Sequence, residues 1–220
     1  MMAIGIDRLN KDGWVSLECE AASEHCLTKT IVELAREIGT PIASRNGKDI
    51  CEKLRPTEAD KARLHSLSKI YSLGSLPLHV DTAHWVTPCR FIILACLKPG
   101  MGNRSTILLD TRSLGLTQSQ SNLLHNTPLR IENGRCSFFG TVLSNDRNFM
   151  RYDPGCMKAV CPDGNKVLDM FKPERWSGFI KKIDWHQGKV VIIDNWRLFH
   201  GRDSSVEADG DRILLRVLIQ

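Results

Sequence analysis

The chain has 220 residues, of which 42% are hydrophobic and 25% are charged, and its formal net charge is +5. This composition is typical of one compact, soluble globular domain and excludes a disordered or fibrous protein. The positive side chains are scattered rather than gathered into a run, which argues against a nucleic-acid-binding surface. A small anionic ligand remains compatible with this charge.

The cysteines and the apolar segments indicate where such a protein resides. None of the eight cysteines forms a C-x-x-C pair, so a structural zinc site is poorly supported. The longest strongly apolar run, residues 91–97, is too short to span a bilayer, and residues 1–12 lack an apolar leader. We therefore expect a reduced, cytoplasmic protein that does not contact membranes. The sequence leaves its oligomeric state open.

The first third of the chain contains one clear helix. Apolar residues follow a helical period over residues 23–38, and Gly39 and Pro41 end the pattern. Residues 42–74 are more polar and predict a short strand followed by loops.

The rest of the chain has a pattern of short strands. Runs of apolar residues separated by Gly, Pro and Asn predict strands at 75–81, 90–97, 106–109, 136–143, 149–152, 189–194 and 212–219. Residues 117–125 predict a small helix with Thr117 as its N-cap, and residues 163–187 an irregular segment or a broken helix around Pro173. Many short strands without a long linker predict a single, mainly β domain with flanking helices, a β-sandwich or a barrel such as a jelly roll.

The sharpest local motif is His79-Val80-Asp81, at the end of a predicted strand. Residues i and i+2 of a strand point to the same face, so His79 and Asp81 can approach one ion. A second, distant histidine would complete a 2-His-1-carboxylate triad, which suits non-haem Fe(II) and oxygen chemistry. Taken alone, H-x-D fits equally a histidine and an aspartate that share a loop hydrogen bond.

His200 is the candidate for the second histidine. It follows the apolar strand 189–194 and precedes Gly201, where it could face a cavity. A core or turn histidine bonded to backbone is the structural alternative. His84, three residues after Asp81, is the competing ligand candidate.

Two arginines on the last predicted strand indicate an anion site. Arg212 and Arg216 are four residues apart, so both project to one face of an otherwise apolar strand. An arginine fork pairs bidentately with a carboxylate such as the distal one of 2-oxoglutarate. An edge strand with a solvated face is the alternative explanation.

Together these segments resemble a known superfamily. Residues 76–85, with Pro88-Cys89-Arg90 and Pro99-Gly100, are similar to the iron-binding region of taurine dioxygenase and clavaminate synthase-like oxygenases. Residues 194–202 resemble the distal-histidine motif of the same superfamily, and residues 212–216 resemble its 2-oxoglutarate-binding strand. The resemblance covers roughly residues 70–220.

The resemblance implies a double-stranded β-helix, or jelly roll, within a single oxygenase domain of residues 1–220. Its core would span residues 71–220, preceded by an N-terminal helix and polar region in residues 1–70. Fe(II) would be bound by His79, Asp81 and His200, with 2-oxoglutarate and O2 as co-substrates. A hydroxyl from Thr106 and a salt bridge from Arg212 would bind 2-oxoglutarate, and Arg216 would lie deeper, near 2-oxoglutarate or a substrate anion.

The implied reaction is hydroxylation, desaturation or cyclisation of a small molecule, with succinate and CO2 as co-products. An amino-acid-like compound or a natural-product intermediate is the expected substrate. Tyr71, His84, Trp85 and Arg151 are candidates for the substrate side, although ordinary packing or a surface role explains each of them too. Two other functions stay open, a non-catalytic ligand-binding β-sandwich and a different metal-dependent enzyme on the same fold.

Overall fold

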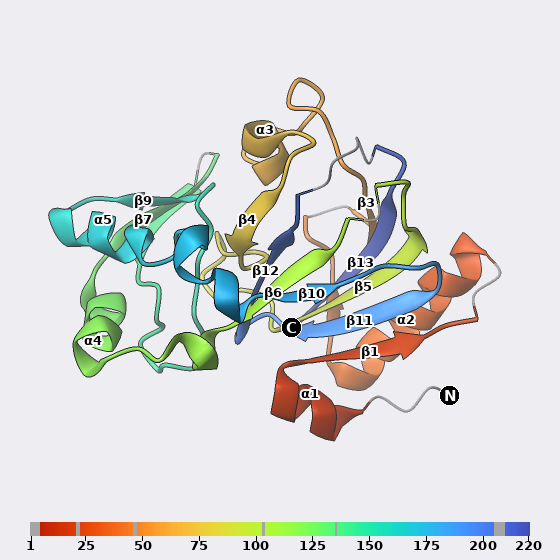
Figure 1. Ribbon diagram of the computed structural model, residues 1–220, viewed down its shortest axis with the longest axis horizontal. Coiled ribbons are helices and arrows are strands. Elements are labelled where there is room, and N and C mark those ends of the chain that lie inside the picture. Colours follow the sequence, from red (N-terminus) through yellow and green to blue (C-terminus); the bar gives the residue numbers. More distant parts are fainter. Residues whose placement is uncertain (1–4, 21–22, 46–47, 103, 135, 205–209) are drawn as a thin grey trace.

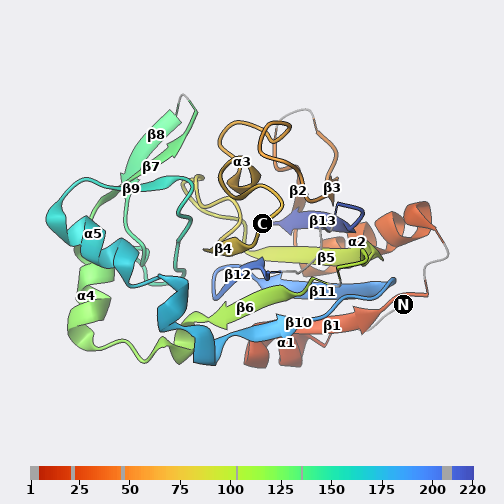
Figure 2. The ribbon, with the colours of Figure 1, turned by 45° about the horizontal axis from the view of Figure 1, so that its top comes forward.

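The computed structural model describes residues 5–20, 23–45, 48–102, 104–134, 136–204 and 210–220. Its strands form two facing antiparallel sheets and a smaller third sheet, with helices outside them (Figures 1 and 2). The prediction of a mainly β, jelly-roll domain with flanking helices is confirmed.

The larger sheet contains strands from both ends of the chain. Its order is β1 (Trp14–Glu18), β11 (Lys189–Asp194), β5 (Phe91–Lys98), β13 (Ile213–Ile219) and β2 (Pro41–Ile42), and β3 (Cys51–Leu54) also pairs with β13. Because β1, β2 and β3 all precede residue 70, the N-terminal third is part of the core sheet. The predicted division at residue 70 therefore does not coincide with a structural boundary.

The second sheet carries most of the predicted site residues. It has four strands in the order β10 (Lys181–Ile183), β6 (Thr106–Asp110), β12 (Leu198–Arg202) and β4 (Leu76–His79). The third sheet has the order β8 (Cys136–Gly140), β7 (Leu129–Asn133) and β9 (Met157–Ala159).

Apolar side chains fill both faces of the larger sheet. In β11, Val191 and Ile193 pack between the two facing sheets, while Val190 and Ile192 pack against the helices on the outer face. Those helices are α1 (Ile6–Asp12) and α2 (Glu24–Ile38) (Figure 1). Burial on both faces explains why β11 is continuously apolar rather than alternating.

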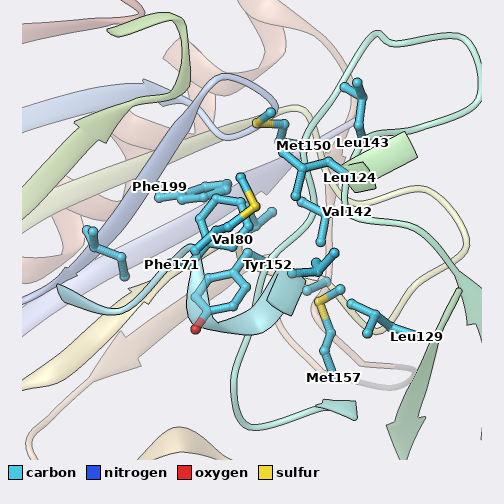
Figure 3. Packing of buried hydrophobic residues seen from close by; sticks show 14 of the residues in the cluster. Val80, Leu124, Leu129, Val142, Leu143, Met150, Tyr152, Met157, Phe171 and Phe199 are labelled. Atoms are coloured by element: carbon cyan, nitrogen blue, oxygen red, sulfur yellow. The ribbon is translucent and has the colours of Figure 1, made fainter. Parts of the chain in front are cut away.

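A separate cluster of buried side chains lies beside the barrel. It packs the third sheet against α4 (Gln118–Asn126) and α5 (Pro162–Asp169). The cluster also includes Val80, directly after β4, and Phe199 of β12 (Figure 3). Single-turn elements complete the chain: α3 (Leu67–Tyr71) and the 3-10 turns Thr111–Leu114, Pro173–Arg175 and Ser177–Phe179. Val80 and Ala83, which follow β4, belong to this cluster, so it packs against the segment just after that strand.

Several sequence predictions about individual elements need correction. The strand predicted at 149–152 is wrong, because within the described residues that segment makes only an isolated bridge between Leu143 and Met150. The predicted strand 136–143 ends at Gly140. Strand β12, which contains His200, was not predicted, because its sequence Leu-Phe-His-Gly-Arg mixes apolar and polar residues without a strand period. By contrast, α4 has Thr117 as its N-cap, as expected.

Candidate metal centre

The two predicted histidine ligands face each other across neighbouring strands. His79 ends β4 and pairs directly with His200 in the antiparallel β4–β12 register. Both side chains are buried, and their ring centroids lie 4.5 Å apart. Direct cross-strand partners share one face of a sheet, so backbone pairing alone brings the two imidazoles together.

Gly201 allows β12 to approach β4 this closely. A Cβ atom at this position would lie 2.6 Å from the carbonyl oxygen of Leu76 and 3.0 Å from that of Pro77. These are backbone atoms within a sheet, so they cannot move aside as a flexible side chain would. The glycine that follows His200 is therefore required by the close packing of β12 against β4.

Asp81 supplies the third polar group of the cluster. Its Oδ1 atom lies 3.9 Å from Nε2 of His79 and 3.9 Å from Nε2 of His200. The ligand atoms of the three residues all lie within 4.8 Å of one another. One carboxylate oxygen and two imidazole nitrogens thus converge on a volume of the size that a single ion requires.

Buried Asn195 fixes the backbone of Asp81. Its side-chain oxygen accepts the Asp81 N–H at 3.0 Å, and its Nδ2 donates to the carbonyls of Asp81 and Cys89 at 3.1 and 2.8 Å. Thr82 then turns the chain with a positive φ of 57°, while its hydroxyl donates to the carbonyl of Asp81. Asp81 is therefore held on a rigid turn immediately after β4.

The hydrogen bonds of the imidazoles leave their Nε2 atoms available to an ion. Nδ1 of His79 lies 2.8 Å from the carbonyl of Pro77, which requires the proton on Nδ1 and leaves the lone pair on Nε2. For His200, Nδ1 is buried without a hydrogen-bond partner in the described residues, while Nε2 faces Asp81. Two imidazole nitrogens and one carboxylate oxygen are the donor set of a 2-His-1-carboxylate site, so these residues fit Fe(II).

The protonation states also fit a metal site. Burial alone would raise the pKa of Asp81, but Arg216, His200 and His79 oppose this and hold it at about 2. Burial and the neighbouring His79 lower the pKa of His200 to about 3. At neutral pH the aspartate is therefore an anion and His200 is neutral, as metal ligands must be.

Arg216 binds the oxygen of Asp81 that points away from the histidines. Its Nη1 donates to Oδ2 of Asp81 at 2.9 Å, and its Nη2 donates to Oε2 of Glu52 at 2.6 Å. Glu52 comes from β3 and also accepts the hydroxyl of Ser44 at 2.5 Å. Arg216 thus joins the N-terminal strand β3 to Asp81 and leaves Oδ1 directed toward the two imidazoles.

Arg212 and Thr106 form a second polar group beside the histidines. Both are buried, and Nη2 of Arg212 donates to Oγ1 of Thr106 at 3.4 Å. The same oxygen accepts the indole N–H of Trp185 at 3.0 Å. A guanidinium and a hydroxyl side by side are suited to a carboxylate.

The triad and this second group line one cavity of about 1570 Å³. The cavity includes His79, Asp81 and His200, and also Thr106, Arg212 and Arg216. His84 and Trp85 line it as well, so two of the four predicted substrate-side residues adjoin the candidate metal centre.

The other two substrate-side candidates, Tyr71 and Arg151, are not among the residues that line this cavity. The guanidinium of Arg151 is buried and donates to the carbonyls of Ala83, Trp85 and Val86 at 3.0, 2.7 and 2.6 Å. Arg151 thus holds the loop that carries Trp85, and a direct substrate contact is not supported by this placement. Tyr71 ends α3, and its ring is only half-buried.

Three residues of the site were not singled out from the sequence: Glu52, Trp185 and Asn195. Glu52 lies in the polar region that the resemblance does not cover, and Trp185 lies in a segment without clear periodicity. Asn195 offered a usable signal, since an asparagine directly after a buried apolar strand often bonds backbone groups there.

Comparisons with known proteins agree with this geometry. Residues 138–218 match the family model for the taurine catabolism dioxygenase TauD, TfdA family. The predicted resemblance to these oxygenases is confirmed. The matched segment contains His200, Arg212 and Arg216 and begins after His79 and Asp81.

Curated relatives include trimethyllysine dioxygenases. The mitochondrial enzyme of Bos taurus is 31% identical over 165 residues, which is 61% of this chain and 38% of the relative. The enzyme of Gallus gallus is 30% identical over 167 residues, with the same shares. The matched region thus spans less than half the length of these relatives.

Solved structures share the fold. Asparagine oxygenase in complex with Fe(II), 3-hydroxyasparagine and succinate aligns with a TM-score of 0.76 and 17% identity, covering 94% of this chain and 74% of that chain. The non-haem iron oxygenase OrfP, in complex with Fe, succinate and (3S)-hydroxy-L-Arg, aligns with a TM-score of 0.72 and 18% identity, covering 98% and 78%. At these identities the likeness establishes the jelly-roll fold.

Within the described part of the chain, no helix combines the length and apolar character needed to cross a membrane.

Proposed function

We propose that this chain is an Fe(II)- and 2-oxoglutarate-dependent oxygenase that hydroxylates a small amino-acid-like molecule. The observation that carries the proposal is the convergence of His79, Asp81 and His200 on one point, with Arg212 and Thr106 lining the same cavity. A binding module has no need for a metal-ligand cluster beside an anion site.

The metal would be held by Nε2 of His79, Nε2 of His200 and Oδ1 of Asp81. Three protein ligands leave coordination positions for the co-substrate and O2, and the bound iron supplies the oxidising chemistry. Arg216 keeps Oδ2 of Asp81 occupied, so the carboxylate presents one oxygen to the ion. Arg216 also lowers the pKa of Asp81, so the ligand is an anionic carboxylate as metal binding requires.

Arg212 and Thr106 would bind the distal carboxylate of 2-oxoglutarate, which is converted to succinate and CO2 in such a reaction. Arg212 is favoured over Arg216 for this role because its guanidinium adjoins the Thr106 hydroxyl in the cavity, whereas Arg216 holds Asp81 and Glu52. Burial strengthens the pairing of Arg212 with an anion and excludes water that would compete for it.

The substrate would enter on the side of His84 and Trp85. These residues follow Asp81 in a loop that Arg151 fixes through three carbonyl groups. A loop held in this way can present an apolar ring at a defined position near the reacting centre, which orients the target C–H bond.

Relatives indicate the substrate class. The curated relatives are named for trimethyllysine, and two structural neighbours were solved with hydroxylated asparagine and arginine. All three are amino acids or their derivatives, which favours such a substrate over a macromolecule. We extend this class, and not any single compound, to the present chain.

The test is a turnover assay in which succinate formation from 2-oxoglutarate is measured with Fe(II) and O2. L-Asparagine, L-arginine and trimethyllysine are supplied in turn, and products are analysed by mass spectrometry. The proposal predicts succinate that depends on Fe(II) and O2, with one compound gaining a single oxygen atom. Loss of two hydrogens instead would indicate desaturation or cyclisation. Metal-dependent turnover without 2-oxoglutarate would favour a different enzyme on this fold, and absence of metal binding would favour a ligand-binding protein.

A further inference from the structure

Trp185 lies beside the candidate 2-oxoglutarate site without lining the cavity itself. It follows β10, in which Ile183 pairs directly with Thr106 of β6. Two residues further on, the buried indole reaches Thr106, and its Nε1 donates to Oγ1 at 3.0 Å. The strand pairing therefore delivers the indole N–H to this one hydroxyl.

The two hydrogen bonds that Oγ1 of Thr106 accepts determine where its hydroxyl proton points. A threonine hydroxyl has one proton to donate and two lone pairs that accept. An indole N–H and a guanidinium can only donate, and both are directed at Oγ1 of Thr106, from 3.0 and 3.4 Å. Both lone pairs are thus engaged by donors, and the proton points away from Trp185 and Arg212.

The remaining direction leads into the cavity, because Thr106 is one of its lining residues. Within the described chain, the bonds recorded at Oγ1 are those in which this oxygen accepts. A hydroxyl held as a donor next to a guanidinium offers an anion two kinds of contact, a hydrogen bond and a charge-assisted pair.

We propose that Trp185 is a positioning residue that holds the Thr106 hydroxyl as a hydrogen-bond donor to the distal carboxylate of 2-oxoglutarate. This inference rests on the proposed function of the same site. Trp185 touches neither the metal ligands nor the co-substrate in this account, and it acts only through Thr106. It therefore contributes to selection of a dicarboxylate over a 2-oxo acid with one carboxylate.

A purely structural role is the competing explanation, since Trp185 also packs in the apolar cluster between the two facing sheets. Packing and positioning make different predictions. Loss of packing would weaken the binding of every ligand, and its effect on affinity would add to that of a Thr106 mutation. Loss of positioning would affect only ligands that reach Thr106 and would disappear once the Thr106 hydroxyl is gone.

The experiment is a double-mutant cycle read by ligand binding. Wild type, Trp185→Phe, Thr106→Val and the double variant are titrated anaerobically with 2-oxoglutarate in the presence of Fe(II), and the visible charge-transfer band reports binding. We expect Trp185→Phe to weaken 2-oxoglutarate binding by about tenfold, the lower end of the range for one hydrogen bond to a charged group. In the Thr106→Val background the same change should cost nothing further. Affinity for 2-oxobutanoate, which lacks the distal carboxylate, should be unchanged.

Trp176→Phe is the matched control. It removes another indole hydrogen bond, from Nε1 to the carbonyl of Met170, in the cluster beside the barrel. It should leave 2-oxoglutarate affinity unchanged. If Trp185→Phe does not fold, benzothienylalanine at position 185 replaces the N–H by sulfur and keeps the ring shape, with the same expected loss.

Equal affinity of Trp185→Phe and wild type for 2-oxoglutarate would overturn the inference, as would a loss that adds fully to that of Thr106→Val. Failure of the proposed function gives a different result, because wild type itself would then show no band with Fe(II) and 2-oxoglutarate.

Discussion

His79 and His200 are direct partners in neighbouring antiparallel strands, with their ring centroids 4.5 Å apart. The metal centre is therefore fixed by backbone pairing between β4 and β12, and a slip of one residue would turn one histidine to the opposite face. Asp81, on the turn after β4, completes the triad, with its backbone held by Asn195 and its Oδ2 by Arg216.

The close approach of β12 to β4 predicts that Gly201→Ala separates these strands. The added Cβ would lie 2.6 Å from the Leu76 carbonyl oxygen, so the pairing that aligns the histidines must shift. We expect a loss of about 1–3 kcal/mol in unfolding free energy and weaker Fe(II) binding. Urea unfolding and metal titration measure the two effects. Gly178→Ala is the control, because a Cβ there meets nothing within 4 Å. If Gly201→Ala had the wild-type unfolding free energy and Fe(II) affinity, the packing argument would be contradicted.

The buried guanidinium of Arg212 predicts a selective loss of 2-oxoglutarate binding in Arg212→Ala. Removing one partner of a buried charge pair costs about 2–5 kcal/mol, so affinity should fall by a factor of roughly 30 or more. Fe(II) binding without co-substrate should be nearly unchanged, because Arg212 donates to Thr106, which is not one of the three metal ligands. Equilibrium titration checks both values. Unchanged 2-oxoglutarate affinity would move this role to Arg216.

The three hydrogen bonds from Arg151 predict that its replacement destabilises the fold and loosens the loop that carries Trp85. Arg151→Met leaves the carbonyls of Ala83, Trp85 and Val86 without their donor, and we expect roughly 2–4 kcal/mol of destabilisation. The loop that carries Trp85 should also exchange its amide hydrogens faster. Hydrogen-exchange mass spectrometry and urea unfolding measure this. Exposed Arg147→Met serves as the control, and equal effects of the two substitutions would refute the assignment.

The lowered pKa of Glu52 predicts that this residue contributes to the unfolding free energy in a pH-dependent way. Burial raises its pKa, but the hydrogen bonds from Ser44 and Arg216 outweigh this and lower it below 4.5. A carboxylate with a lowered pKa stabilises the fold above the unfolded-state value and loses this contribution as pH falls through the folded-state value. Metal-free wild type should therefore be more stable than Glu52→Gln at pH 7, and the difference should shrink below pH 4.5. A difference that stays constant from pH 7 to pH 3.5 would exclude this role.

The sequence predicted the triad and the anion site because each uses residues with a local signature. His79 and Asp81 form a short H-x-D motif at the end of β4, and Arg212 directly precedes the terminal apolar strand β13. The partners that complete the site could not be predicted in this way. Glu52 reaches Arg216 through the β3–β13 pairing, and Trp185 reaches Thr106 through the β10–β6 pairing. Such contacts depend on long-range strand order, which periodicity within one segment does not encode.

The strand that carries His200 shows the same limit. Pairing with β6 on one side and β4 on the other makes Leu198–Arg202 a strand, and its own composition gives little β preference. The resemblance to known oxygenases indicated His200 as a ligand, whereas the pairing that brings it to His79 became evident only from the fold.

The central claim is that His79, Asp81 and His200 hold Fe(II) together with 2-oxoglutarate. Anaerobic titration of the metal-free protein with Fe(II) and then 2-oxoglutarate tests it most directly, with the visible metal-to-ligand charge-transfer band as the readout. The account predicts a saturable band in wild type and its loss in His79→Ala and Asp81→Ala, both with far-UV circular dichroism like that of wild type. A folded wild-type protein that gives no band, or a band that persists in both variants, would contradict it.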